Sequence, residues 1–158
     1  GASSGPVGLI LTRQGIPVLD GTSADGVAKG GYVLGGGNPT DDADVILIAT
    51  GSELQLAVEA QKLLADKDIN ATVVSMPCVE WFEAQPQDYQ DAVLPPSVSA
   101  RVAVEAGVAM PWHKFVGDTG EIVSIEHYGE SADDKTLFRE FGFTPEAVAA
   151  AAERSIAN

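Results

Sequence analysis

Residues 44–64, DVILIATGSELQLAVEAQKLL, decide the fold of this chain. An uninterrupted apolar run from Val45 to Ala49 predicts a strand that is buried on both faces. The run breaks at Thr50-Gly51-Ser52, after which apolar residues return at helical spacing: Leu56, Ala60, Leu63 and Leu64. A strand that leads directly into a helix is the repeating unit of parallel α/β sheets. The charged residues of this helix are expected on its solvated face: Glu53, Glu59, Lys62 and Asp66.

The turn between this strand and helix has a structural and a functional interpretation. Ser52 and Gln55 match the capping box, in which the hydroxyl accepts from a first-turn amide and the amide side chain reaches back. Helix-start amides also bind anions, which makes Gly51 and Ser52 a candidate anion site. A dinucleotide loop needs more glycines, however, and Glu53 places a carboxylate where the phosphate would bind. Structural capping is the favoured interpretation, with a small-anion-binding regulatory module as the alternative.

Composition limits the class of protein. The 158 residues, 45% of them hydrophobic, fit one domain with a sizeable core. A net charge of -14 argues against nucleic acid and anionic membrane surfaces as partners. The single Cys78 cannot form an internal disulfide, and the sequence has neither a membrane-spanning apolar run nor a signal-peptide pattern. We therefore expect a cytoplasmic protein.

The rest of the pattern alternates between strands and helices, which predicts a largely parallel sheet. Four further strands are predicted, at residues 31–34, 71–75, 101–105 and 121–125. A helix is predicted at residues 52–65, and further helical segments are predicted at 79–82, 86–93 and 112–116. The chain closes with helices at 133–141 and 145–157. Thr144 is the expected cap of the last helix, which is expected to dock through Val148 and Ile156.

The first thirty residues differ from the rest. Residues 1–5 resemble a cloning remnant or a cut linker, and residues 7–12, VGLILT, form a short apolar run without a partner strand. Residues 14–30 lack periodicity and contain several glycines and Pro17, which predicts an extended interdomain linker. The glycines at 35–37 are interpreted as a turn. Arg13 follows the apolar run at the sheet edge where α/β folds bind ligands, and its guanidinium suits phosphate. One residue is a weak motif, so the residues alone favour a plain surface arginine over a phosphate site.

No pattern in the sequence specifies a catalytic, metal-binding or cofactor-binding group. His113 and His127 lack the spacing of metal ligands, and no G-x-S-x-G motif is present. Cys78 follows a predicted buried strand and is interpreted as a small core residue. Trp81, Phe82 and Trp112 are expected in the core or at an interface.

Seven sequence blocks, taken in order, resemble transketolase. They are LTRQ at 11–14, KGGYVL at 29–34, IATGSE at 48–53, VVSMP at 73–77, RVAVEAG at 101–107, YGESAD at 128–133 and LFREFGFT at 137–144. The resemblance covers the chain from Pro6 to its end. It implies that residues 6–13 are the last strand of an absent pyrimidine-binding domain, 14–30 the linker, and 31–158 the C-terminal domain.

The resemblance also implies a fold and an activity. The fold is a three-layer α/β/α sandwich around a five-stranded mixed sheet of order 1-3-2-4-5, whose first strand is antiparallel. The parent enzyme would use thiamine diphosphate and Mg²⁺ or Ca²⁺ to move a two-carbon ketol unit between sugar phosphates, as a homodimer. Arg13 matches the residue that binds the substrate phosphate in this family. The cofactor residues of the family lie outside this sequence.

The expected function is therefore that of a non-catalytic domain fragment that supports the dimer and packs against the rest of its own polypeptide. Related thiamine-diphosphate enzymes share this domain type, namely dihydroxyacetone synthase and 2-oxoacid dehydrogenase subunits, and remain alternatives. The sequence does not indicate which sugar phosphates the parent prefers.

Overall fold

A five-stranded mixed sheet organises the molecule in the computed structural model, which describes residues 5–6, 8–35 and 42–158. The strands are β1 (Tyr32–Val33), β2 (Val45–Ala49), β3 (Ala71–Ser75), β4 (Arg101–Val104) and β5 (Glu121–Val123). Their order is β1-β3-β2-β4-β5. Strand β1 runs antiparallel to β3, and all other neighbours are parallel. The predicted strand order and the antiparallel first strand are confirmed.

The central strand β2 divides the hydrophobic core in two. All five of its residues are fully buried, as expected of a strand covered on both faces. Because side chains alternate along a strand, Val45, Leu47 and Ala49 enter one core cluster, while Ile46 and Ile48 enter the other. Both faces of the sheet are therefore closed by helices.

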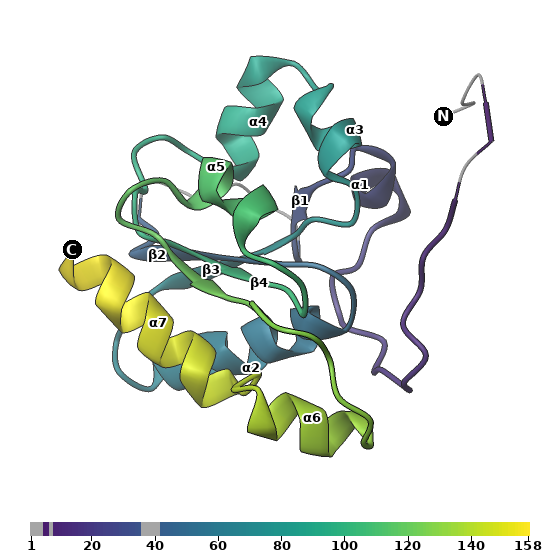
Figure 1. Cartoon of the computed structure of the whole chain (residues 1–158). Helices are drawn as coiled ribbons and strands as arrows, with labels where there is room; N and C mark the ends of the chain where they lie inside the picture. The colour runs from purple at the N-terminus through teal and green to yellow at the C-terminus, as the bar shows by residue number, and fades with distance from the viewer. Residues whose placement is uncertain (1–4, 7, 36–41) are drawn as a thin grey trace.

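The helices form the two outer layers. Helices α2 (Leu54–Ala65), α6 (Asp134–Glu140) and α7 (Pro145–Ala157) lie on one side of the sheet, and α3 (Val79–Glu83), α4 (Gln87–Val93) and α5 (His113–Val116) lie on the other (Figure 1). Helix α1 (Ala24–Ala28) lies beside β1. Short 3-10 helices precede α2 and α5, at η1 (Gly51–Glu53) and η2 (Met110–Trp112). This arrangement is the predicted three-layer sandwich.

Helix α7 docks through small residues. Val148 is fully buried as predicted, but Ile156 is 41% exposed, so its predicted docking role is wrong. The buried face instead consists of Ala149, Ala151, Ala152 and Ser155, and it packs against α2. Alanines lack the bulk to separate two helices, so α7 can lie close to α2, and Ile156 in the last turn stays at the surface.

The N-terminal region divides into two parts. Leu9, Ile10 and Leu11 are 80%, 97% and 74% exposed, and the described residues 8–13 form no strand. Val7 and residues 36–37 of the turn predicted at 35–37 lie outside the described residues. The predicted linker contains α1, capped by the Ser23 hydroxyl, so its expected extended conformation does not hold at Ala24–Ala28. No helix among the described residues is long and apolar enough to cross a membrane.

Candidate functional site

The carboxyl ends of β2, β4 and β5 meet at one edge of the sheet, where α/β folds bind their ligands. The turn after β2 carries Ser52 and Glu53, and β4 is followed by Glu105. The chain after β5 carries Glu126 and His127. This edge therefore holds the predicted anion site and is the first place to look for chemistry.

The turn after β2 does not form the predicted capping box. The 3-10 helix η1 precedes α2. The N-cap of η1 is Thr50 and the N-cap of α2 is Glu53, and neither side chain makes a capping hydrogen bond. The Ser52 hydroxyl donates to Glu53 Oε1 at 2.9 Å, and Gln55 Nε2 donates to the Ser52 carbonyl at 3.0 Å. Because Ser52 lies inside the first turn, its hydroxyl cannot reach the amides that a capping serine would satisfy. The prediction that Ser52 caps the helix is therefore wrong, because the N-cap positions belong to Thr50 and Glu53.

Glu53 is buried, contrary to the predicted solvated position. Glu53 is only 5% exposed, and this burial raises the pKa of its carboxyl group. The hydrogen bond from Ser52 opposes this shift, and the neighbouring charge of Glu105 adds to it. Glu105 in turn accepts a hydrogen bond from the indole N–H of Trp112, which is itself buried as predicted. A buried acidic side chain thus occupies the turn.

This arrangement is unfavourable for an anion at Gly51 and Ser52. Gly51 is exposed with a φ of +57°, a conformation that suits glycine, but its neighbour Ser52 is buried and already donates to a carboxylate. A bound phosphate would meet the charge of Glu53 in the same turn. The geometry therefore favours a structural role for these residues.

The histidines do not gather metal ligands. His127 places its ring edge-on to Phe141, with ring centroids 4.9 Å apart, and His113 begins α5. Glu126 accepts from the Ala109 amide at 2.7 Å and the Ser124 hydroxyl at 3.0 Å, and the first of these bonds is the main reason its pKa is lowered. The described residues contain no group of three or more His, Cys, Asp or Glu side chains able to hold a metal ion.

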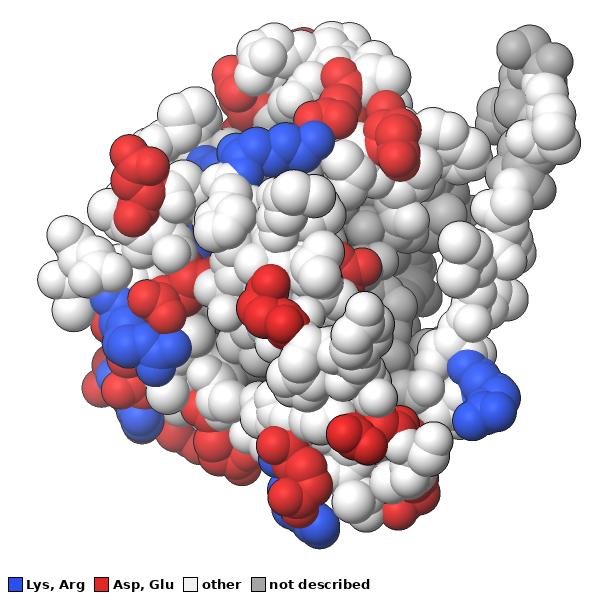
Figure 2. Space-filling view, viewed as in Figure 1, with Lys and Arg blue, Asp and Glu red and all other residues white. Residues whose placement is uncertain are grey.

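Most basic side chains have structural partners. Arg101 donates to the carbonyls of Leu94, Pro95, Val98 and Phe115. Four other basic residues form ion pairs with glutamates, namely Lys67, Lys114, Arg139 and Arg154. Figure 2 shows acidic side chains scattered over the visible face, with basic ones beside some of them. The described surface offers no basic stripe for nucleic acid.

Arg13 differs from these residues. It is exposed, and within the described ranges no hydrogen bond or ion pair involves its guanidinium. The structure does not bring it together with the turn at Thr50–Glu53. The adjacent hydroxyl of Thr12 bonds to the side chain of Gln14 instead. Arg13 is thus available to a ligand, and its phosphate role stays a prediction.

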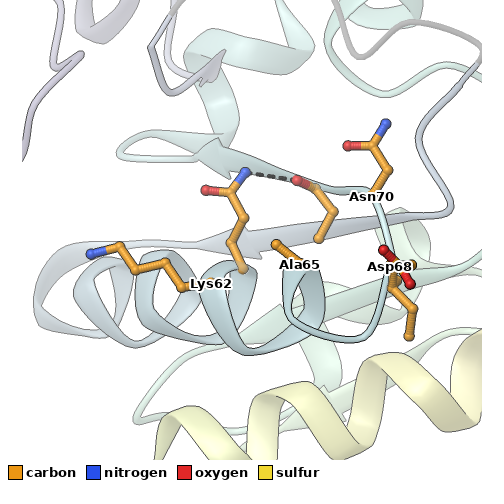
Figure 3. A pocket seen from close by; sticks show the side chains of 7 residues that line it. Lys62, Ala65, Asp68 and Asn70 are labelled. Atoms are coloured by element: carbon orange, nitrogen blue, oxygen red, sulfur yellow. Dashed lines mark hydrogen bonds between the residues drawn. The ribbon is translucent and has the colours of Figure 1, made fainter.

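Two hollows among the described residues lie away from these groups. One, of about 450 Å³, lies between the end of α2 and the start of β3 and includes Lys62, Asp68 and Asn70 (Figure 3). Gln61 crosses it to donate to the Ala71 carbonyl at 2.7 Å. A second, of about 270 Å³, lies at the amino ends of β2 and β4. Both are at the sheet edge opposite the one where ligands of this fold class bind.

The fold and these surfaces define a class: a three-layer α/β/α domain whose described residues assemble no metal centre. Residues 30–144 match the family model of the transketolase-like C-terminal domain. The chain belongs to this family.

Individual relatives agree with the family assignment. The chain is 78% identical to a transketolase of Mycobacterium tuberculosis over 158 residues, covering 98% of this chain and 23% of that protein. It is 76% identical to a transketolase of Mycobacterium leprae, covering all of this chain and 23% of the relative. A crystal structure of Pichia stipitis transketolase in complex with sedoheptulose-7-phosphate superposes with a TM-score of 0.83 at 38% identity, covering 92% of this chain and 20% of that one. The chain thus spans about a quarter of the length of these curated relatives.

Proposed function

We propose that the protein to which this domain belongs transfers a two-carbon ketol unit from a ketose phosphate to an aldose phosphate. The observation that carries the proposal is the 78% identity to a transketolase over nearly the whole chain, together with the matching sheet order. The family implies a cytoplasmic homodimer that uses thiamine diphosphate and Mg²⁺ or Ca²⁺. The relatives matched here are transketolases, which favours this activity over that of dihydroxyacetone synthase or a 2-oxoacid dehydrogenase subunit.

The described residues do not themselves fit the cofactor. A diphosphate needs free amide donors or cations, but the helix start after β2 holds the buried carboxylate of Glu53. The divalent cation needs converging oxygen ligands, and no such group forms among the described side chains. We infer that this domain, residues 31–158, supports the dimer and packs against the rest of its own polypeptide. Residues 6–13 would complete a sheet of the preceding domain, joined through 14–30.

Arg13 is the residue we assign to the substrate. Its guanidinium is exposed and has no partner among the described residues, which supports a role in holding the sugar phosphate, because a bidentate fork matches phosphate oxygens. By binding the phosphate, Arg13 would position the substrate, and residues of the rest of the enzyme would carry out the chemistry. This role fits a relative whose crystal structure holds sedoheptulose-7-phosphate.

The test is an Arg13→Met substitution in the full-length enzyme. The KM for a phosphorylated ketose should rise by about tenfold to a hundredfold, the range for loss of a charged hydrogen-bonded contact. The KM for an unphosphorylated ketose should stay unchanged, because that substrate never uses the guanidinium. Arg139→Met, which alters an exposed arginine of α6, is the matched control. Equal effects on both substrates would refute the assignment.

The non-catalytic nature of the isolated chain can be tested directly. The 158-residue chain, mixed with thiamine diphosphate and Mg²⁺, should show no ketol transfer above the buffer background. Any turnover proportional to the concentration of this chain would contradict the proposal. Titrating the same sample with a sugar phosphate while following the amides of Gly51 to Leu54 tests the anion alternative, for which we expect no shifts at millimolar ligand.

A further inference from the structure

The second half of the predicted linker is held against the domain, and its contacts point to a function in fixing the linker. We propose that residues 19–31 are a strap fastened by Tyr89, and that the pivot between this domain and the preceding chain lies upstream, at residues 14–18. The inference rests on the proposed interdomain role of 14–30. It is independent of the catalytic activity, because it concerns contacts within this chain alone.

Tyr89 of α4 makes two contacts with the strap. Its hydroxyl donates to the Gly31 carbonyl at 2.8 Å. The ammonium group of Lys29 lies 4.4 Å from the centroid of the same ring, within the range of a cation–π contact. The phenol is partly buried, and it links two segments 58 residues apart in sequence. One side chain therefore fastens both the end of α1 and the entry to β1.

Two glycines let the strap lie close to the domain. Gly30 has a φ of +84°, and a Cβ there would come within 2.3 Å of the Cys78 carbonyl oxygen and the Phe82 nitrogen. The Gly30 carbonyl accepts from the Cys78 amide at 3.0 Å. A Cβ on Gly26 would overlap the ring of Tyr32 at 2.4 Å. The backbone of the strap therefore packs directly against the domain at these two glycines, where any larger side chain would clash.

The contacts stop at Leu19, which is partly buried against the core cluster that includes Val45 and Leu56. The Gly35 amide donates to the Gly21 carbonyl at 3.2 Å and holds the strap near this upstream end. Before this point Ile16 and Val18 are 44% and 94% exposed, and Leu9 to Leu11 are largely exposed as well. Backbone without packing or hydrogen bonds opens easily, so rotation between the domains concentrates there.

Trypsin offers a sharp test, because it cleaves after Arg13 and after Lys29. Both side chains are exposed, so exposure alone predicts cleavage at both. The strap predicts that the bond after Lys29 is cut at least about tenfold more slowly in the intact chain, because its backbone must first leave its seat. Mass spectrometry of a time course measures both rates in one sample.

Variants of Tyr89 separate the two contacts. Tyr89→Phe keeps the ring and should speed cleavage after Lys29 by about fivefold, as expected for the loss of one hydrogen bond. Tyr89→Ala should speed it further, while cleavage after Arg13 stays constant in both. Tyr128→Phe, at a residue 97% exposed, is the matched control and should change neither rate.

Amide exchange of the unaltered chain guards against variants that fail to fold. The Cys78 amide, which bonds to Gly30, should exchange slowly, while amides of residues 14–18, apart from Pro17, exchange at the rate of an unfolded peptide. Equal cleavage after Arg13 and Lys29 in the unaltered chain, or fast exchange at Cys78, would overturn the proposal. An inactive full-length enzyme with a protected strap would refute the proposed activity and leave this inference standing.

Discussion

Glu53 shows how one buried carboxyl makes stability depend on pH. Burial raises its pKa in the folded state above the value of the unfolded chain. The folded protein therefore holds the proton more tightly, and its contribution to stability is full below the unfolded pKa and is lost as pH rises through the folded pKa. The residue consequently works against the folded state at neutral pH.

We predict that Glu53→Gln stabilises the domain at pH 7 relative to pH 4. The amide keeps the shape of the side chain and can accept from the Ser52 hydroxyl, but it carries no charge to desolvate. The difference in free energy of unfolding between variant and unaltered chain should grow as pH rises, as measured by urea denaturation at several pH values. Using this difference cancels groups such as Glu126 and Asp133, whose pKa values are lowered by hydrogen bonds to the Ala109 amide and to Thr136.

Glu59→Gln is the matched control, since Glu59 lies on the exposed face of the same helix. It should leave the pH profile unchanged. If Glu53→Gln follows the unaltered chain at every pH, the buried charge has no energetic cost and this account of the turn fails.

At the scale of single elements, α7 owes its start to a side-chain cap. The Thr144 hydroxyl accepts from the Ala147 amide at 3.2 Å, and Pro145 occupies the first turn. The helix then buries only small residues beyond Val148, so its docking supplies little apolar area for its length. A helix with this composition depends on its cap more than one with large anchors.

We therefore predict that Thr144→Ala lowers the free energy of unfolding by about 1 kcal/mol. Thr144→Ser retains the accepting hydroxyl and should lose much less. Chemical denaturation followed by far-ultraviolet circular dichroism measures both variants. A serine variant as unstable as the alanine variant would show that the methyl group of Thr144, and not its cap, stabilises the helix.

The elements also show what a sequence reveals and what it hides. Strand β2 was predictable because a run of five apolar residues is buried on both faces wherever it forms. The position of Ser52 was not, because a single 3-10 turn displaces the cap and the sequence pattern of both helix types is the same. The raised pKa of Glu53 also reflects the charge of Glu105, which lies on another strand end and is distant in sequence. Local periodicity cannot reveal such contacts.

At the scale of the whole molecule, the family blocks predicted the strand order, while the residues alone predicted only a parallel sheet. The helix α1 was missed because its five residues contain a glycine and show no apolar periodicity, and the Ser23 cap and docking against β1 stabilise it. Arg13 was singled out because a guanidinium after an apolar run is visible in the sequence, and its phosphate role stays a prediction. Local sequence cannot show which groups would surround a phosphate at this residue.

The division of the N-terminal region yields a final prediction. Removing residues 1–13 should leave the free energy of unfolding of the chain unchanged within about 0.5 kcal/mol, because Leu9, Ile10 and Leu11 make little contact with the domain. Removing residues 1–30 also deletes α1 and the Gly30 carbonyl that binds the Cys78 amide, so this chain should unfold at clearly lower urea concentration. Urea titrations of the two truncations beside the full 158 residues make the comparison. The shorter deletion also removes three exposed apolar side chains, so sedimentation should show less self-association. A large loss of stability on removing residues 1–13 alone would mean that this segment packs on the domain, and would place the boundary upstream of Arg13.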